Sequence, residues 1–218
     1  MTVDLFGNLA QEAEAAPEPL AAGAVLLRGW ALAASGALLA AIKEVSAHAP
    51  FRTMTTPGGH RMSAAMTNCG AAGWVSDLRG YRYDARDPLT HTRWPPMPPV
   101  FRELAAGAAA KADFAGFCPD ACLINRYEPG ARLSLHQDRN ERDLGEPIVS
   151  VSLGLPAVFL FGGHARAQRA RRVPLAHGDV VVWGGPARLN YHGTLPLKEG
   201  EHRVLGRCRI NLTLRRAL

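Results

Sequence analysis

The second half of the chain constrains its fold most strongly, because it reads as a series of short strands separated by turn signals. Runs rich in β-branched and apolar side chains are typical of strands, and pairs such as Pro129-Gly130, Gly162-Gly163 and Gly184-Gly185 are typical of the turns between them. The predicted strands are 120–128, 132–138, 147–153, 157–161, 171–176, 179–183, 188–193 and 207–215. Eight short strands in succession favour a double-sheet jelly roll, the double-stranded β-helix.

The first half predicts elements that flank this β core. Residues 1–19 are acidic and alanine-rich, which predicts a flexible N-terminal tail, and residues 20–218 are predicted to form a single domain. A strand is expected at Ala24–Arg28, and helices are expected from Ser35 to before Pro50 and from Val100 to about Ala112. Residues 51–94 lose apolar periodicity, which predicts a binding lid inserted in the domain. The fold class is therefore mainly β with flanking N-terminal helices (α+β).

Three potential iron ligands lie in the strand-rich half. His136-Gln137-Asp138 places an imidazole and a carboxylate two residues apart, and His192 follows in the predicted strand 188–193. Because side chains alternate along a strand, His136 and Asp138 are predicted to share one face. Two histidines and one carboxylate hold non-haem Fe(II) and leave positions open for a chelating co-substrate and O₂. The spacing alone is a weak signal, since an isolated histidine is more often an ordinary hydrogen-bonded residue.

The last predicted strand, 207–215, has one apolar face and one polar face that carries two arginines. Its apolar face is predicted to carry Cys208, Ile210, Leu212 and Leu214, and its polar face Arg209, Asn211, Thr213 and Arg215. Arginines that point into a pocket need an anion, and the guanidinium fork fits a carboxylate. Together with the possible iron ligands, this stripe predicts a dicarboxylate that bridges iron and arginine. A solvated face of an edge strand is the alternative.

Composition adds supporting observations on partners and compartment. The net charge of +6 favours polyanionic partners. The four cysteines have no zinc-type spacing and are predicted to be free thiols, as in a reducing, cytoplasmic setting. The sequence shows neither a signal-peptide pattern nor an apolar run of membrane-spanning length, so we expect no membrane partner.

Several longer blocks of sequence carry a family resemblance. They include Met62-Ser-Ala-Ala-Met-Thr-Asn-Cys-Gly, Leu133-Ser-Leu-His-Gln-Asp, Pro147-Ile-Val-Ser-Val-Ser-Leu-Gly-Leu-Pro and His177-Gly-Asp-Val-Val-Val-Trp-Gly-Gly. With these blocks the chain resembles the AlkB family of Fe(II)/2-oxoglutarate-dependent nucleic-acid dealkylases, from Glu18 to Arg216. The resemblance implies a monomeric dioxygenase domain at 20–218, with residues 51–94 as a nucleotide-recognition lid.

The resemblance also implies roles for the metal and co-substrate residues. His136, Asp138 and His192 would bind Fe(II), and the co-substrates would be 2-oxoglutarate and O₂. Arg209 would bind the distal carboxylate of 2-oxoglutarate and Arg215 the end that chelates iron. The further polar partners of the co-substrate would be Asn125, Tyr127 and Asn211.

On the substrate side, the resemblance implies an alkylated base, such as 1-methyladenine or 3-methylcytosine, stacked between Trp74 and His136. The nucleic acid would be single-stranded DNA, with double-stranded DNA and RNA as further candidates, and demethylation would release formaldehyde, succinate and CO₂. Other substrate-side positions are Thr56, Met66, Tyr81, Arg132, Ser134 and Arg166. A ring face suits a flipped, cationic base.

One position departs from the family's bacterial founding branch. An acidic residue stands there two positions after the metal-binding aspartate, and this chain has Asn140. Asn140 can accept a hydrogen bond from a base but adds no charge, which leaves base preference open. Two other functions remain as alternatives. One is the same oxidant acting on a small molecule or a protein side chain, and the other is a non-catalytic metal-binding jelly-roll module.

Overall fold

A computed structural model of the chain describes residues 16–218. Its helices are α1 (Ser35–His48), α2 (Pro99–Lys111) and the short 3-10 helix η1 (Gly185–Ala187). The strands of the first half are β1 (Glu18–Ala21), β2 (Ala24–Leu27), β3 (Arg52–Thr55), β4 (Arg61–Gly70), β5 (Gly73–Asp77) and β6 (Gly80–Asp84). Those of the second half are β7 (Ala121–Tyr127), β8 (Leu133–His136), β9 (Ile148–Gly154), β10 (Ala157–Phe161), β11 (Arg171–Leu175), β12 (Val180–Trp183), β13 (His192–Thr194) and β14 (Arg209–Arg215).

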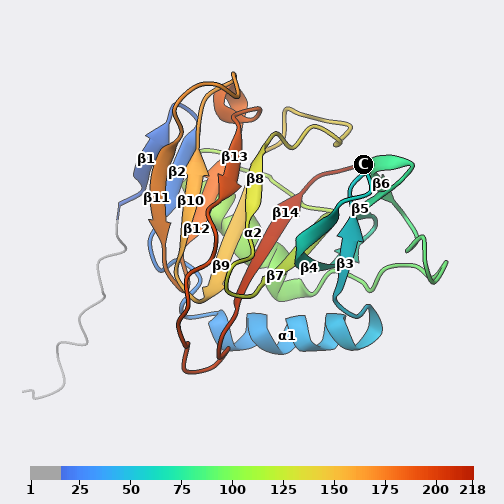
Figure 1. Cartoon of the computed structure of the whole chain (residues 1–218). Coiled ribbons are helices and arrows are strands. Elements are labelled where there is room, and N and C mark those ends of the chain that lie inside the picture. The colour runs from blue at the N-terminus through green and yellow to red at the C-terminus, as the bar shows by residue number, and fades with distance from the viewer. Residues whose placement is uncertain (1–15) are drawn as a thin grey trace, which may run out of the picture.

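The strands form two main sheets and one separate hairpin. The large sheet has the order β1-β2-β12-β9-β14-β7-β4-β3, and the small sheet has the order β11-β10-β13-β8. Figure 1 shows β10, β13 and β8 side by side in the small sheet. Within the part of the chain that the structure describes, strands β5 and β6 pair only with each other. The prediction of a mainly β, jelly-roll architecture with two flanking helices is confirmed.

Alternating side chains of the large sheet build two apolar layers. Val180 and Val182 of β12 pack in a cluster with residues of α1 and α2, whereas Val181 and Trp183 pack with Phe159 of the small sheet. One face of the large sheet is therefore covered by helices and the other by the small sheet, as expected where a strand is buried on both faces. The predicted faces of β14 are confirmed, because Ile210, Leu212 and Leu214 belong to the helix-side cluster. Its polar residues consequently point between the two sheets.

The region 51–94 is more regular than its sequence predicts. It contains four strands, and two of them, β3 and β4, extend the large sheet. Strand β4 pairs with β7 from Ala65 to Gly70, so long-range pairing rather than its own periodicity determines its structure. The β5–β6 hairpin is the part of the region that lies outside both main sheets. Strand β1 begins at Glu18, inside the predicted tail 1–19, and residues 1–15 of that tail lie outside the described residues.

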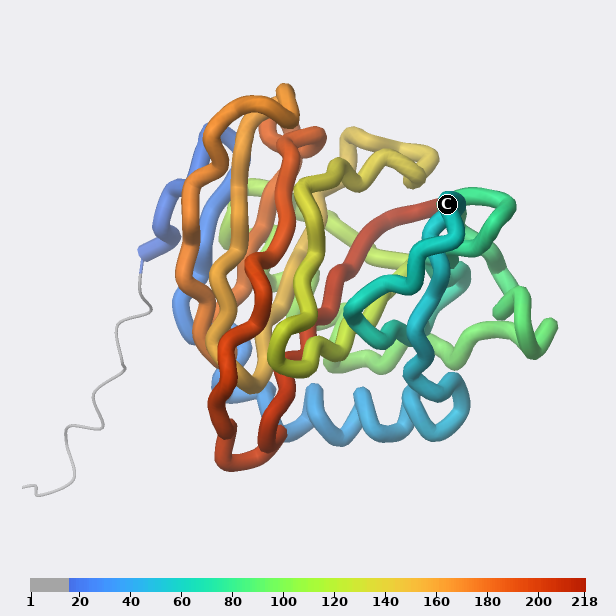
Figure 2. The backbone as a smooth tube through the Cα atoms, viewed as in Figure 1, coloured from blue at the N-terminus to red at the C-terminus, as the bar shows by residue number. Residues whose placement is uncertain are grey.

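Two predicted strand boundaries near the iron ligands are wrong. Strand β8 ends at His136, so Asp138 belongs to the loop of residues 137–147, which Figure 2 shows leaving β8 before the chain enters β9. The predicted strand 188–193 is mostly a turn, because η1 precedes it and only its last residues belong to β13. Pro186 at the start of η1 favours this turn through its fixed φ. Within residues 16–218, no helix is long and apolar enough to span a membrane.

Candidate active site

Pairing of two strands in the small sheet brings the two histidines together. In the antiparallel register of β8 and β13, His136 lies opposite His192. The residue after His192 is Gly193, and a Cβ atom there would lie 2.6 Å from the carbonyl oxygen of Leu133. A side chain at this position would push β8 away, so the glycine permits the close approach of the two histidine-bearing strands.

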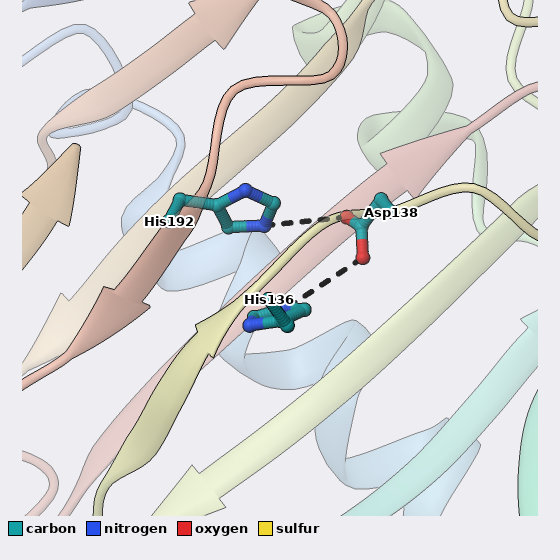
Figure 3. A group of neighbouring side chains, drawn as sticks. All are labelled: His136, Asp138 and His192. Carbon is teal, nitrogen blue, oxygen red and sulfur yellow. Dashed lines mark ion pairs between the residues drawn. The ribbon is translucent and has the colours of Figure 1, made fainter. Parts of the chain in front are cut away.

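Asp138 completes a cluster of three potential metal ligands. Its Oδ1 lies 3.6 Å from Nε2 of His136 and its Oδ2 lies 3.6 Å from Nε2 of His192, as Figure 3 shows. The ligand atoms of the three residues all lie within 4.8 Å of one another. Asp138 therefore reaches the histidines from the loop rather than through strand alternation.

Hydrogen bonds orient both imidazoles for metal binding. Nδ1 of His136 lies 2.8 Å from the carbonyl oxygen of Ser134, and Nδ1 of His192 lies 3.0 Å from that of Asn190. A carbonyl can only accept, so Nδ1 carries a proton in each ring, and in the neutral ring Nε2 keeps its lone pair. Both lone pairs belong to the nitrogens that face Asp138. This donor set of two imidazole nitrogens and one carboxylate fits a non-haem Fe(II) ion.

The protonation states suit metal binding as well. Burial, reinforced by the nearby His192, lowers the pKa of His136 to about 4, so this ring is neutral at pH 7. Burial by itself raises the pKa of Asp138, but the guanidinium of Arg215 and the two histidines outweigh it and hold that pKa well below its usual range. Neutral imidazole and ionised carboxylate are the forms that ligate a metal.

Arg215 joins Asp138 to a second buried carboxylate that sequence reasoning does not identify. Nη2 of Arg215 lies 2.5 Å from Oδ2 of Asp138, and Nε of Arg215 lies 3.3 Å from Oε1 of Glu141. The other oxygen of Glu141 pairs with Nη2 of Arg188 at 3.1 Å, and the hydroxyl of Tyr83 donates to Glu141 at 2.7 Å. The sequence marks these two residues only by their positions: Glu141 lies three residues after Asp138, and Arg188 lies four residues before His192.

Arg209 lies on the inner face of β14 with unused donors. Its side chain is buried, its Nη2 donates to Oγ of Ser152 at 3.0 Å, and its guanidinium lies 5.1 Å from the ring centroid of Tyr127. Within the described part of the chain, Nε and Nη1 of Arg209 are buried without a hydrogen-bond partner, and so is Oδ1 of the nearby strand residue Asn125. Orphaned guanidinium N–H groups are costly unless an anion meets them, so this pocket fits the distal carboxylate of 2-oxoglutarate.

Unlike Arg209 and Asn125, Asn211 has hydrogen-bond partners within the sheet for both its amide nitrogen and its amide oxygen. Its amide nitrogen donates to Oγ of Ser150 at 2.8 Å and to the carbonyl oxygen of Val151 at 3.0 Å. Its amide oxygen accepts a hydrogen bond from Thr213 at 3.0 Å. These contacts fix Asn211 within the sheet, although it lies opposite Asn125 in the register of β14 and β7. Its role toward the co-substrate stays a prediction.

The β5–β6 hairpin brings aromatic side chains to the metal-bearing loop. Trp74 and Tyr81 stack with ring centroids 5.6 Å apart and an angle of 15° between the planes. Nε1 of Trp74 donates to Oδ1 of Asn140 at 3.3 Å, so the hairpin contacts the loop two residues after Asp138. Trp74 is partly exposed and Tyr81 is exposed, which leaves aromatic surface for a ligand.

The remaining predicted substrate residues occupy different environments. Met66 is buried on β4 and lies opposite Asn125, whereas Thr56 follows β3 and accepts a hydrogen bond from the backbone of His60. Ser134 is exposed on β8, and its carbonyl oxygen orients His136. Arg132 and Arg166 are exposed in the segments before β8 and after β10. Their roles in substrate binding stay predictions.

Comparisons with known proteins agree with this geometry. The family model described as the 2OG-Fe(II) oxygenase superfamily matches residues 23–215. The chain is 58% identical over 217 residues to the alpha-ketoglutarate-dependent dioxygenase AlkB of Salmonella typhimurium, covering 99% of this chain and 98% of that protein. It is 55% identical over 215 residues to AlkB of Escherichia coli, again covering 99% and 98%. The solved structure of OsALKBH1 superposes with a TM-score of 0.81 at 28% identity, covering 92% of this chain and 99% of that one. With its cluster of two histidines and one aspartate intact, the chain belongs to the 2OG-Fe(II) oxygenase superfamily and, within it, to the AlkB family of dioxygenases.

Proposed function

We propose that this protein is an Fe(II)- and 2-oxoglutarate-dependent dioxygenase that demethylates alkylated bases in nucleic acid, with single-stranded DNA as its principal substrate. The observation that supports this proposal most strongly is that a complete cluster of iron ligands lies in the same site as the buried guanidinium of Arg209, which has nitrogens without a hydrogen-bond partner among the described residues. A binding module that merely keeps a metal does not need this second, costly feature. Bases of the 1-methyladenine and 3-methylcytosine type are the proposed substrates.

The residues of the site divide the work of such a reaction. His136, Asp138 and His192 would hold Fe(II), and Arg209 with Asn125 and Tyr127 would bind the distal end of 2-oxoglutarate. When bound, iron and 2-oxoglutarate supply an oxidant that inserts one oxygen atom of O₂ into a methyl C–H bond, while the other oxygen enters succinate as CO₂ leaves. A hydroxymethyl group on a ring nitrogen then releases formaldehyde and restores the base. Arg215 would bind the end of 2-oxoglutarate that chelates iron, and it also keeps the Asp138 carboxylate ionised and oriented.

The β5–β6 hairpin supports the nucleic-acid part of the proposal. The rings of Trp74 and Tyr81 offer stacking surfaces to a base lifted out of the strand, and Arg132 and Arg166 are exposed cations for phosphates. The net charge of +6 adds a favourable field for a polyanion. We include in the proposal that the region 51–94 serves as a nucleotide-recognition lid, that the chain acts as a monomer, and that it works in the cytoplasm, where free cysteines such as Cys69 stay reduced.

Mass spectrometry of methylated oligonucleotides tests this function directly. Single-stranded DNA that contains one 3-methylcytosine is incubated with the protein, Fe(II), ascorbate and 2-oxoglutarate, and parallel reactions use the same lesion in duplex DNA and in RNA. We expect loss of one methyl group per lesion, together with formaldehyde and succinate. Succinate formation that is unaffected by any of the oligonucleotides would instead indicate a different substrate class.

A further inference from the structure

Glu141 is a buried carboxylate that the proposed reaction does not use. Its side chain is 1% exposed and lies between two buried guanidinium groups, those of Arg188 and Arg215. A carboxylate removed from water is costly unless it is well paired, and Glu141 has an ion pair on each oxygen. Among the described contacts Glu141 pairs with none of the three iron ligands, and it reaches Asp138 through Arg215 and Arg188.

Arg215 is divided between the metal centre and Glu141. Its Nη2 and Nε both bond Oδ2 of Asp138, at 2.5 and 3.0 Å, and the same Nε lies 3.3 Å from Glu141. Arg188 also holds this loop, since it donates to the carbonyl oxygen of Asp138 at 2.7 Å while pairing with Glu141. Glu141 is therefore a second carboxylate that holds the guanidinium of Arg215, beside the one that would hold iron.

Tyr83 connects this cluster to the β5–β6 hairpin. It lies on β6, in register with Trp74 of β5, and its hydroxyl donates to Oε1 of Glu141, the same oxygen that pairs with Arg215. Burial, with a further contribution from the charge of Glu141, raises the pKa of Tyr83 well above its ordinary value, so the hydroxyl keeps its proton and remains a donor. A continuous chain of contacts thus runs from Trp74 through the hairpin to Tyr83, Glu141 and Arg215.

We propose that Glu141 is a positioning residue that couples the β5–β6 hairpin to the co-substrate side of the metal centre. When 2-oxoglutarate engages Arg215, the Glu141–Tyr83 contact favours the hairpin position in which Trp74 is set for the base. Binding of a base against the hairpin favours, in turn, the Arg215 position that receives 2-oxoglutarate. Such coupling is reciprocal, since each ligand must change the affinity of the other by the same factor.

The coupling between the oligonucleotide site and the 2-oxoglutarate site is a quantity that ordinary destabilisation of the fold does not change. The coupling factor is the ratio of oligonucleotide Kd values measured without and with saturating 2-oxoglutarate. A residue that only supports the fold would weaken both affinities and leave this ratio intact. A residue that links the two sites changes the ratio, and couplings of this kind are typically about 5- to 150-fold.

The experiment uses the full chain loaded with Mn(II), so that binding is measured without turnover. Oligonucleotide binding is followed by anisotropy of a labelled single strand that contains 3-methylcytosine, with and without 2-oxoglutarate, and calorimetry gives the reciprocal ratio. The variants are Glu141→Gln and Tyr83→Phe. The control is Glu146→Gln, the same substitution in the same loop, where the carboxylate pairs with the half-exposed Arg216.

A second measurement needs no nucleic acid. Hydrogen exchange of residues 73–84 is compared with and without 2-oxoglutarate in the Mn(II) protein, and we expect slower exchange in the presence of the co-substrate. This arm depends on binding of 2-oxoglutarate, which calorimetry checks separately, but not on the proposed nucleic-acid substrate. The oligonucleotide arm rests on that proposed substrate, since a wild-type chain that binds no methylated strand would refute the substrate while the exchange arm still decides the coupling.

We expect a wild-type coupling factor of at least about fivefold. It should fall to near one in Tyr83→Phe and Glu141→Gln, and the co-substrate effect on exchange should disappear in both. Glu146→Gln should behave like the wild type. A wild-type effect of 2-oxoglutarate that Tyr83→Phe retains in full would overturn the proposal, and so would a wild-type chain whose hairpin exchange does not respond to 2-oxoglutarate. If Glu141→Gln does not fold, Tyr83→Phe alone decides, because it removes one hydroxyl and no charge.

Discussion

Replacing Arg209 by lysine keeps a positive charge at the inner end of the site and removes the planar guanidinium. The structure gives Arg209 one hydrogen bond, to Ser152, and two buried N–H-bearing nitrogens without a partner among residues 16–218. If these nitrogens donate to 2-oxoglutarate, an ammonium group can replace one of their hydrogen bonds but not both. Loss of one charged hydrogen bond costs on the order of 1.5–3 kcal/mol, so the Kd for 2-oxoglutarate should rise by roughly 10- to 150-fold.

The same substitution should make co-substrate binding depend on pH. Burial lowers the pKa of Arg209, but arginine starts so high that it keeps its charge at every working pH. A lysine in the same buried position starts near 10.4 and can drop by several units, so it must take up a proton to meet the dianion. The affinity of Arg209→Lys should therefore weaken further as the pH rises from about 7 to about 9, while that of the wild type stays constant.

Calorimetry of 2-oxoglutarate binding to the Mn(II) protein measures both effects. The matched control is Arg207→Lys, the same substitution two residues earlier, where the side chain is 69% exposed and pairs with Glu199. DNA affinity measured without 2-oxoglutarate should change little in either variant. Equal losses of co-substrate and DNA affinity in Arg209→Lys would refute the reasoning, because they would mean that this strand face does not serve the co-substrate.

Three further changes test the metal centre and the base site. His136→Ala should abolish formaldehyde release while thermal melting still shows a folded chain, because apolar packing rather than the metal ligands stabilises the core. Normal activity of this variant with added Fe(II) would contradict the assignment of His136 as a metal ligand. Asn140→Asp should raise the ratio of the demethylation rate of cationic 3-methylcytosine to that of neutral 3-methylthymine by about fivefold, because the added carboxylate contributes roughly 1 kcal/mol of screened attraction. An unchanged rate ratio would indicate that Trp74 sets the base preference instead. The free energy of unfolding of the metal-free chain should fall as the pH is lowered from 6.5 to about 4, because over that range His136 is protonated when unfolded and neutral when folded. Melting curves at constant ionic strength check this, and His136→Gln should flatten the slope.

The parts of the fold that the sequence predicts well are those with their own periodicity. Strand β14 could be placed within two residues because its polar and apolar side chains alternate, and that alternation also identifies Arg209 and Arg215 as neighbours on one face. Helices α1 and α2 were predicted closely for the same reason, since their apolar spacing and the adjacent prolines are local signals. Local patterns therefore locate half of the site, namely the residues on regular strands.

The rest of the site depends on contacts between distant segments. Strand β4 has a mixed composition and becomes a strand by pairing with β7, and no local sequence pattern predicts this pairing. Asp138 and Glu141 lie in the loop after β8, where side-chain alternation does not apply. The partners of Glu141 come from β6 and from the turn before β13, so its role becomes visible only when the chain is folded.

The charges buried around the metal centre give a physical reason why iron and 2-oxoglutarate belong together. Asp138 and Glu141 contribute two buried negative charges, and Arg188, Arg209 and Arg215 contribute three buried positive ones. The residues alone thus leave one positive charge in excess when the histidines are neutral. Fe(II) by itself would add two more positive charges to a region of low dielectric, and the 2-oxoglutarate dianion by itself would reverse the excess. Binding both returns the site to its original balance, so each group lowers the electrostatic cost of burying the other.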